Sequence, residues 1–241
     1  MDIRITHLYP DLMSIYGDRG NVRTLERRSV WRDIAVEVRT CTVGQTLEAE
    51  WADLYFFGGG QDQGQDLVGQ DLAGANGRAL RQAIAGGAAV LAVCGGYQLL
   101  GHAYVPGTGP AIPGLGVLDV TTRVEKERSV GDLLAERGEE TLVGFENHSG
   151  MTYLGAGAAP LARVTRGRGN NGKDRTEGAV QGAVVGTYCH GSVLPKNPWL
   201  ADLLLTWALA RRYGPVALAR LDDREEHAAH EAAIRAARSR R

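Results

Sequence analysis

Short apolar segments alternate with longer amphipathic segments through the first hundred residues. Residues 3–8 and 35–40 alternate apolar and polar positions, which is typical of half-buried strands. Residues 53–57 and 88–93 are continuous apolar runs, which predict strands buried on both faces of a sheet. Helices are expected between and after them, at residues 22–34, 67–84 and 97–104. This alternation predicts an α/β fold with a mostly parallel sheet flanked by helices.

The second half of the chain has more strand character. Strands are expected at residues 116–122, 141–145, 162–165 and 180–188. Residues 165–177 are rich in Gly, Asn and Arg and predict an exposed loop, whereas residues 197–213 have the pattern of an apolar helix. After Pro215 the sequence is dominated by Ala, Arg and Glu. We therefore expect one domain over residues 1–213 and a charged, helical, solvated tail over residues 214–241.

Composition narrows the class of protein. The 241 residues include 27 Lys and Arg against 28 Asp and Glu, so no overall basic charge exists to bind nucleic acid or an anionic membrane. The 3 cysteines are widely spaced, which argues against a disulfide framework, and no CxxC pair predicts a metal site. No window approaches the roughly 18 apolar residues of a membrane span. We expect a soluble cytoplasmic protein with reduced thiols.

The segment with the clearest chemical signature is residues 90–98, VLAVCGGYQ. Cys94 stands where a predicted buried strand ends and a helix begins, and two glycines follow it. A sharp strand-turn-helix elbow of this kind exposes a nucleophile. The adjoining helix N-terminus favours a thiolate, and the N–H of Gly95 points where an oxyanion would develop. The alternative is a buried structural cysteine, which behaves as a small hydrophobic residue.

A cysteine nucleophile needs a base, and six histidines are present. His190 directly follows a predicted strand, so it should emerge at the carboxyl edge of the sheet together with Cys94. His148 is the competing candidate. His102 is expected inside a helix with a structural role, and His227 and His230 are expected to be solvated on the tail.

Three glycines, Gly58, Gly59 and Gly60, follow the apolar strand at residues 53–57. They lack the Lys-Ser/Thr of a P-loop and the spacing of a dinucleotide fingerprint. A phosphate-binding role is therefore less well supported than a second oxyanion donor, in which glycine lets a backbone N–H approach the reacting atom.

These features together resemble a known family. The glycine triplet, the CGGYQ elbow and the late His190 resemble class I glutamine amidotransferases, which have a flavodoxin-like fold. Four further blocks, THLYP at 6–10, YGDRGN at 16–21, GFENH at 144–148 and YCHG at 188–191, are similar to the subgroup related to cobyric acid synthase, and within it to the glutaminase subunits of lipid II isoglutaminyl synthases. The resemblance extends from residue 1 to about Tyr213.

The resemblance implies a catalytic role for several residues. Cys94 would attack the side-chain amide of glutamine, and His190 would act as general base and then general acid. The N–H groups of Gly95 and Gly60 would hold the oxyanion.

The resemblance also implies how the substrate is bound. Gln98 would contact the bound glutamine, and Arg128 would bind its α-carboxylate through a bidentate pair. Arg128 can also be interpreted as one exposed charge in a charged run. Many class I members have a glutamate two residues after the histidine, where this chain has Ser192. The cobyric acid subgroup lacks that glutamate too, and we hypothesise that a carboxylate of a partner subunit orients His190.

The implied partner is a MurT-like synthetase subunit of the Mur ligase family, joined to this chain in a heterodimer. No cofactor or metal is expected in this chain, because it has no ATP motif; ATP and Mg²⁺ are expected on the partner. The implied reaction amidates the α-carboxylate of D-glutamate in lipid II, at the inner face of the membrane. The alternatives are an amidotransferase of another pathway such as corrinoid amidation, a non-catalytic scaffold of the same fold, and a thiol protease with a similar elbow.

Overall fold

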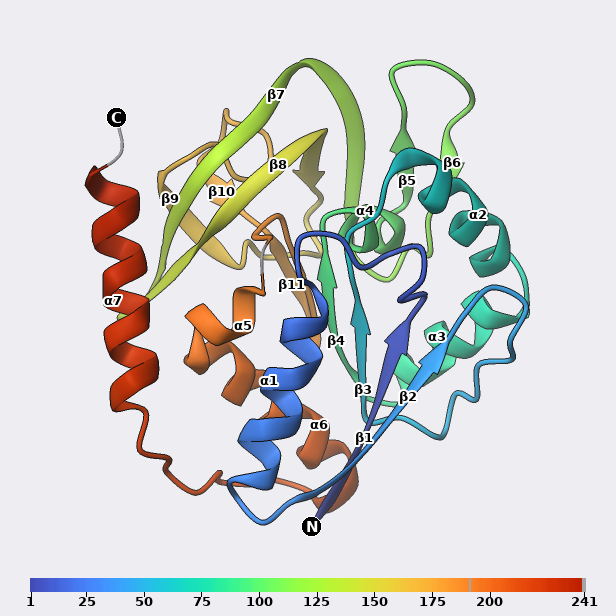
Figure 1. Cartoon of the computed structure of the whole chain (residues 1–241). Coiled ribbons are helices and arrows are strands. Elements are labelled where there is room, and N and C mark those ends of the chain that lie inside the picture. Colours follow the sequence, from blue (N-terminus) through green and yellow to red (C-terminus); the bar gives the residue numbers. More distant parts are fainter. Residues whose placement is uncertain (191, 240–241) are drawn as a thin grey trace.

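The computed structural model describes residues 1–190 and 192–239. Its central sheet has the strand order β11-β12-β4-β3-β1-β2, and only β11 is antiparallel to its neighbour (Figure 1). In chain order the parallel strands read 2-1-3-4-5, which is the flavodoxin-like order, so the predicted fold class is confirmed. The strands are β1 (Asp2–Leu8), β2 (Ala35–Cys41), β3 (Leu54–Phe57), β4 (Ala89–Val93), β11 (Ala179–Gln181) and β12 (Val184–Thr187).

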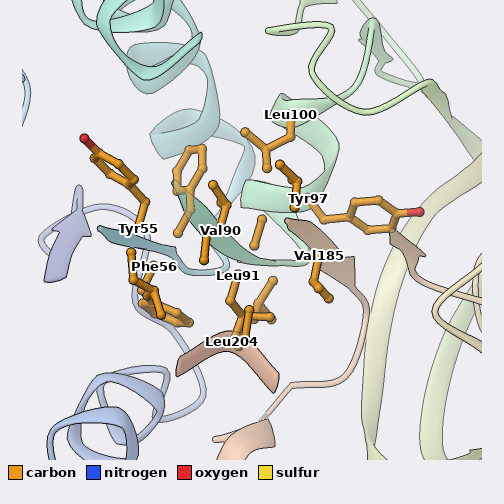
Figure 2. Close-up of a cluster of buried hydrophobic side chains, with 14 of the residues drawn as sticks. Tyr55, Phe56, Val90, Leu91, Tyr97, Leu100, Val185 and Leu204 are labelled. Carbon is orange, nitrogen blue, oxygen red and sulfur yellow. The ribbon is translucent and has the colours of Figure 1, made fainter. Parts of the chain in front are cut away.

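The centre of the core lies on both faces of β3 and β4. Every residue of these two strands is buried, as their continuous apolar sequences predict. Tyr55 pairs with Val90 and Phe56 pairs with Leu91 in register, so neighbouring side chains point to the same face. Figure 2 shows Leu204 of the helix α6 (Pro198–Tyr213) beneath Leu91, while Tyr97 and Leu100 of the helix α4 (Gly95–Leu100) lie on the opposite face.

Helices cover both faces of the central sheet. Figure 1 shows α1, α5 and α6 together on one side, and α2 and α3 on the other. Their bounds are α1 (Arg19–Val30), α2 (Asp62–Leu72), α3 (Ala75–Ala85), α4 (Gly95–Leu100), α5 (Val193–Lys196) and α6 (Pro198–Tyr213).

Two of the predicted helices were too long. The helix expected at 67–84 is divided into α2 and α3, because Gly74 precedes α3 in a non-helical conformation. The helix expected at 97–104 ends at Leu100, and the chain continues into the strand β5 (Ala103–Val105). His102 therefore lies outside a helix, and its half-exposed ring pairs with Asp119 at 2.9 Å.

A second sheet stands beside the first and is built on a long antiparallel hairpin. Its order is β10-β9-β7-β5-β6, and β8 pairs with β7. The register of the hairpin shifts between Val124 and Ser129, which marks a bulge in β7. The remaining bounds are β6 (Ile112–Pro113), β7 (Val120–Arg137), β8 (Glu140–Leu154), β9 (Ala162–Arg166) and β10 (Thr176–Glu177).

The loop at 165–177 is not simply exposed, as the sequence suggested. Asn170, Asn171 and Glu177 within it are buried, with at most 1% of their surface accessible. Asn170 donates hydrogen bonds to Thr176 Oγ1 and to the carbonyl of Gly178. Hydrogen bonds from a polar side chain of this segment to residues close by in the sequence thus accompany its burial.

The C-terminal segment forms the helix α7 (Arg224–Ser239), which packs against α5, β7 and β8 (Figure 1). It is less solvated than expected, since Ala237 is buried with Leu134 and Val143. His230 also contacts the body of the protein, through Nδ1 and the carbonyl oxygen of Lys196 at 2.5 Å. Across the described residues, no helix combines the length and apolarity needed to span a membrane.

Candidate active site

The predicted chemical residues gather at the carboxyl edge of the central sheet. The glycine triplet follows β3, Cys94 follows β4 and His190 is the third residue after β12. The loop after β1 lies at the same edge, where the strand order reverses between β1 and β3. In open α/β sheets ligands bind at such a switch point.

Cys94 occupies the strained turn that the sequence predicted. Its backbone has φ +48° and ψ −106°, a conformation rare for any residue with a side chain. Its carbonyl accepts the N–H of Gln98, which starts the α4 helix. Gly96 must be a glycine, because a Cβ there would lie 2.6 Å from the carbonyl oxygen of Phe57. Gly95 is the first residue of α4, so its N–H has no acceptor within the helix.

His190 approaches Cys94 across the α-carbon of Gly59. A Cβ on Gly59 would lie 3.0 Å from His190 Cε1 and 3.4 Å from Cys94 Cβ, so both side chains border this glycine and a larger residue would crowd the imidazole. The ring of Tyr16 packs edge-on against the imidazole, with 5.0 Å between ring centres. The histidine has no accessible surface.

The environment of His190 keeps it neutral. Burial lowers its pKa to about 4, the nearby His148 acts in the same direction, and the backbone of Asn147 opposes the shift. Within residues 1–190 and 192–239, neither ring nitrogen has a hydrogen-bond partner. Ser192, two residues after His190, donates to the carbonyl of Gly17. The structure thus presents a nucleophile and a neutral base, and no carboxylate of the described residues is hydrogen-bonded to that base.

A cavity of about 490 Å³ opens beside this pair. Cys94, Gly60, Gln98 and Arg128 all line it, so the structure brings these predicted residues together. Gly95 directly follows Cys94 at the start of α4, and His190 borders the same glycine, Gly59, as Cys94 does.

Arg128 reaches the cavity from the bulge in β7. Its Nε donates to Asn147 Oδ1 at 2.8 Å, and Asn147 Nδ2 donates to the hydroxyl of Tyr16 at 2.7 Å. These contacts leave the terminal nitrogens of the guanidinium for an anionic group. Tyr16 and Asn147 were not singled out from the sequence, although they lie in the YGDRGN and GFENH blocks.

Gln98 is held in a buried hydrogen-bond network. Its Oε1 accepts from Gln65 at 2.7 Å and its Nε2 donates to the hydroxyl of Tyr188 at 3.1 Å. The Tyr188 hydroxyl also contacts Thr152 Oγ1 at 2.7 Å. The amide retains one N–H and one lone pair for a ligand. Gln65 was missed because nothing in the sequence around it indicates a site.

His148, the competing base, lines the cavity but has a different setting. Its ring stacks on Tyr188 with centres 3.6 Å apart, and its Nδ1 contacts the carbonyl oxygen of Gly150 at 2.7 Å. These contacts fix the ring in place. In the part of the chain that is described, no group of three or more His, Cys, Asp or Glu side chains is placed to hold a metal ion.

Comparison with known sequences supports a specific family. Residues 4–198 match the CobB/CobQ-like glutamine amidotransferase domain. The chain is 37% identical to the lipid II isoglutaminyl synthase (glutamine-hydrolyzing) subunit GatD of Staphylococcus aureus (strain N315), over 93% of this chain and 92% of that protein. It is 39% identical to the GatD subunit of Streptococcus pneumoniae (strain ATCC BAA-255 / R6), over 88% and 82%.

More distant matches share only part of their length or only the fold. The cobyric acid synthase of Limosilactobacillus reuteri (strain DSM 20016) is 33% identical over 68% of this chain but only 34% of that protein. Among solved structures, PurLQS from Thermotoga maritima aligns with a TM-score of 0.59 and 15% identity, over 87% of this chain and 98% of that one. The structural match shows the fold alone.

Proposed function

Because the chain belongs to the CobB/CobQ-like glutamine amidotransferase family, we propose that it hydrolyses L-glutamine to L-glutamate and ammonia at Cys94. The observation that carries this proposal is the approach of Cys94 and His190 across the α-carbon of Gly59, beside a cavity that contains Arg128. A nucleophile, a neutral base, two candidate oxyanion donors and a cation for a carboxylate then lie around one space.

The first half of the reaction forms a thioester. His190 takes the thiol proton of Cys94, and the sulfur attacks the side-chain amide carbon of glutamine. The N–H groups of Gly95 and Gly60 stabilise the negative oxygen of the tetrahedral intermediate. When the intermediate collapses, the carbon–nitrogen bond breaks and His190 returns the proton to the leaving nitrogen, which departs as ammonia.

The second half restores the enzyme. His190 takes a proton from water, and the hydroxide attacks the thioester carbon through a second oxyanion. The carbon–sulfur bond then breaks, glutamate leaves, and Cys94 regains a proton from His190. Arg128 binds the α-carboxylate of the substrate throughout, and Gln98 contacts it with its remaining amide hydrogen or lone pair.

The product ammonia is used by a second subunit in this proposal. The GatD relatives match this chain along nearly its whole length, whereas the cobyric acid synthase matches it over about a third of its own length, which favours the lipid II pathway over corrinoid amidation. A MurT-like synthetase of the Mur ligase family would bind ATP and Mg²⁺ and amidate the α-carboxylate of D-glutamate in lipid II. The heterodimer would act in the cytoplasm, at the inner face of the membrane.

The direct test measures ammonia released from L-glutamine by the purified chain, alone and with a MurT-like partner. We expect release that Cys94→Ala abolishes. The matched control is Cys41→Ala, which removes another buried thiol at the end of β2, away from the cavity. A wild-type complex that forms but releases no ammonia would contradict the proposal and favour a scaffold.

A glutamine-mimicking electrophile separates the remaining alternatives. We expect mass spectrometry to find it on Cys94 and not on Cys41, and excess glutamine to protect Cys94 from it. Cleavage of peptides without protection by glutamine would instead indicate a thiol protease.

A further inference from the structure

The glycine triplet after β3 is tied down at three backbone atoms. The carbonyl of Gly58 accepts the N–H of Gly96 at 3.1 Å. The N–H of Gly59 donates to Asp18 Oδ2 at 2.7 Å, and the carbonyl of Gly59 accepts the N–H of Ile15 at 3.3 Å. One of these ties is a side chain, and it comes from the loop between β1 and α1.

These ties determine the direction of the next N–H. In a trans peptide the carbonyl of Gly59 and the N–H of Gly60 point in opposite directions. Because the carbonyl of Gly59 points to Ile15, the N–H of Gly60 points away from Ile15. Glycine has no Cβ to restrict such a peptide, so without the ties the Gly59–Gly60 plane could rotate at little cost.

Burying the carboxyl group of Asp18 costs folding free energy. The side chain has no accessible surface, and its Oδ1 has no hydrogen-bond partner among the described residues. Burial raises the pKa of this carboxyl to about 7, and the N–H of Gly59 only partly offsets the shift. A buried polar atom without a partner costs folding free energy.

The loop around Asp18 also touches the segment after His190. A Cβ on Gly20 would lie 2.2 Å from Ser192 Oγ, and Ser192 donates to the carbonyl of Gly17. Asp18 therefore belongs to a segment that contacts both the glycine triplet and the base-bearing loop.

We propose that Asp18 is a positioning residue, which fixes the Gly58–Gly59 peptide and so limits rotation of the following Gly59–Gly60 peptide, whose carbonyl Ile15 also holds, so that the Gly60 N–H is directed at the oxyanion of the glutaminase reaction. This inference rests on the proposed function. Asp18 touches neither substrate nor reacting atoms and acts only through the backbone of Gly59. Its loss lets the peptide rotate, which removes one of the two oxyanion donors.

The test compares Asp18→Ala, which removes the acceptor, with Asp18→Asn, which keeps an acceptor oxygen in the same place. Loss of one oxyanion donor lowers kcat by about 100-fold or more. We expect that loss in Asp18→Ala with the KM for glutamine within about 3-fold of wild type, since the substrate-binding residues are unchanged. Asp18→Asn should recover most of kcat. Asp11→Ala, which removes an exposed carboxylate from the same loop, is the matched control.

A second measurement reports the Cys94–His190 pair without an oxyanion. Iodoacetamide alkylates Cys94 by displacing iodide, so its rate and pH profile should be the same in wild type and Asp18→Ala. Amide hydrogen exchange should show Gly59 protected in wild type and Asp18→Asn but not in Asp18→Ala.

Three results would overturn the inference. The first is an Asp18→Ala enzyme with wild-type kcat, and the second is an equal loss of kcat and iodoacetamide reactivity, which indicates general damage to the site. The third result applies if Asp18→Ala does not fold: it is a folded Asp18→Asn enzyme whose kcat is about 100-fold below that of wild type. A wild-type complex without glutaminase activity contradicts the proposed function instead, and Gly59 exchange still tests the tie.

Discussion

At the scale of single residues, the backbone of the site was more predictable than its hydrogen-bond partners. The elbow at Cys94 follows from a buried strand, two glycines and a helix, all local in sequence. The partners of Arg128 and Gln98 come from segments far along the chain, such as Tyr16 and Gln65. Their contacts depend on how the two sheets are packed, which no local pattern records.

The buried imidazole of His190 should make folding sensitive to acid. Its pKa falls from 6.5 to about 4 on folding, so the folded state favours the neutral form. The stability that this neutral imidazole contributes is complete above about pH 6.5 and decreases as the pH falls towards 4. Below about pH 4 the total loss amounts to about 3 kcal/mol. Between pH 6.5 and 4, denaturant unfolding of wild type should therefore lose about that much more free energy than His190→Asn. Parallel pH curves for the two proteins would show that His190 is not buried as a neutral group.

Arg128 should determine glutamine affinity more than turnover. A guanidinium binds a carboxylate with two parallel hydrogen bonds, which an ammonium cannot reproduce. We expect Arg128→Lys to raise the KM for glutamine by about 10- to 100-fold, with kcat changed far less, because the contact is the same in the ground and transition states. Arg123→Lys, an exposed arginine on the same strand, should leave both constants unchanged. Equal KM values for the two variants would assign Arg128 to the solvated surface.

At the scale of elements, the central sheet was predicted better than the second sheet, although the single strand expected at 180–188 is two antiparallel strands, β11 and β12. Strands β3 and β4 are buried on both faces, so their apolar runs are unambiguous. Strands β7 and β8 alternate irregularly, because a bulge shifts their register and the residues around the bulge line the cavity. Only short parts of them were expected as strands, and the bulge that presents Arg128 had no sequence signal.

The tail is held to the domain by a buried arginine of α1. Arg28 has 1% of its side chain exposed and pairs with Asp202 of α6 and with Asp223, just before α7, both at 2.7 Å. Removing one member of a buried ion cluster leaves the other charges unpaired and costs about 3–5 kcal/mol. We expect Arg28→Ala to lower the free energy of unfolding by that amount in chemical denaturation.

The control for this prediction lies on the same helix. Arg23 pairs with Glu26, but its side chain is 60% exposed, so Arg23→Ala should cost less than about 1 kcal/mol. A similar small loss for Arg28→Ala would mean that α7 and its linker add little to the stability of the domain.

At the scale of the whole molecule, the described residues assemble a site in which no carboxylate is hydrogen-bonded to the base. The strands bring the nucleophile, base and cavity to one edge of the sheet, yet neither ring nitrogen of His190 has a partner within the described residues. A base with a pKa of about 4 is also a weak proton acceptor at neutral pH. A partner carboxylate beside His190 would fix the ring and raise its pKa at the same time.

Glutaminase activity should therefore depend on assembly with the synthetase subunit. In serine proteases, removing the charge of the carboxylate that orients the catalytic histidine lowers kcat by about 10⁴-fold. We therefore expect the kcat of the complex to exceed that of the free chain by about 100-fold or more. The acid limb of kcat/KM should also move upward, from about pH 4 in the free chain towards the ordinary histidine value in the complex. Substituting the partner's acidic residues that face this edge should remove both effects while the complex still forms. A free chain as active as the complex, with the same acid limb, would show that His190 needs no carboxylate from outside.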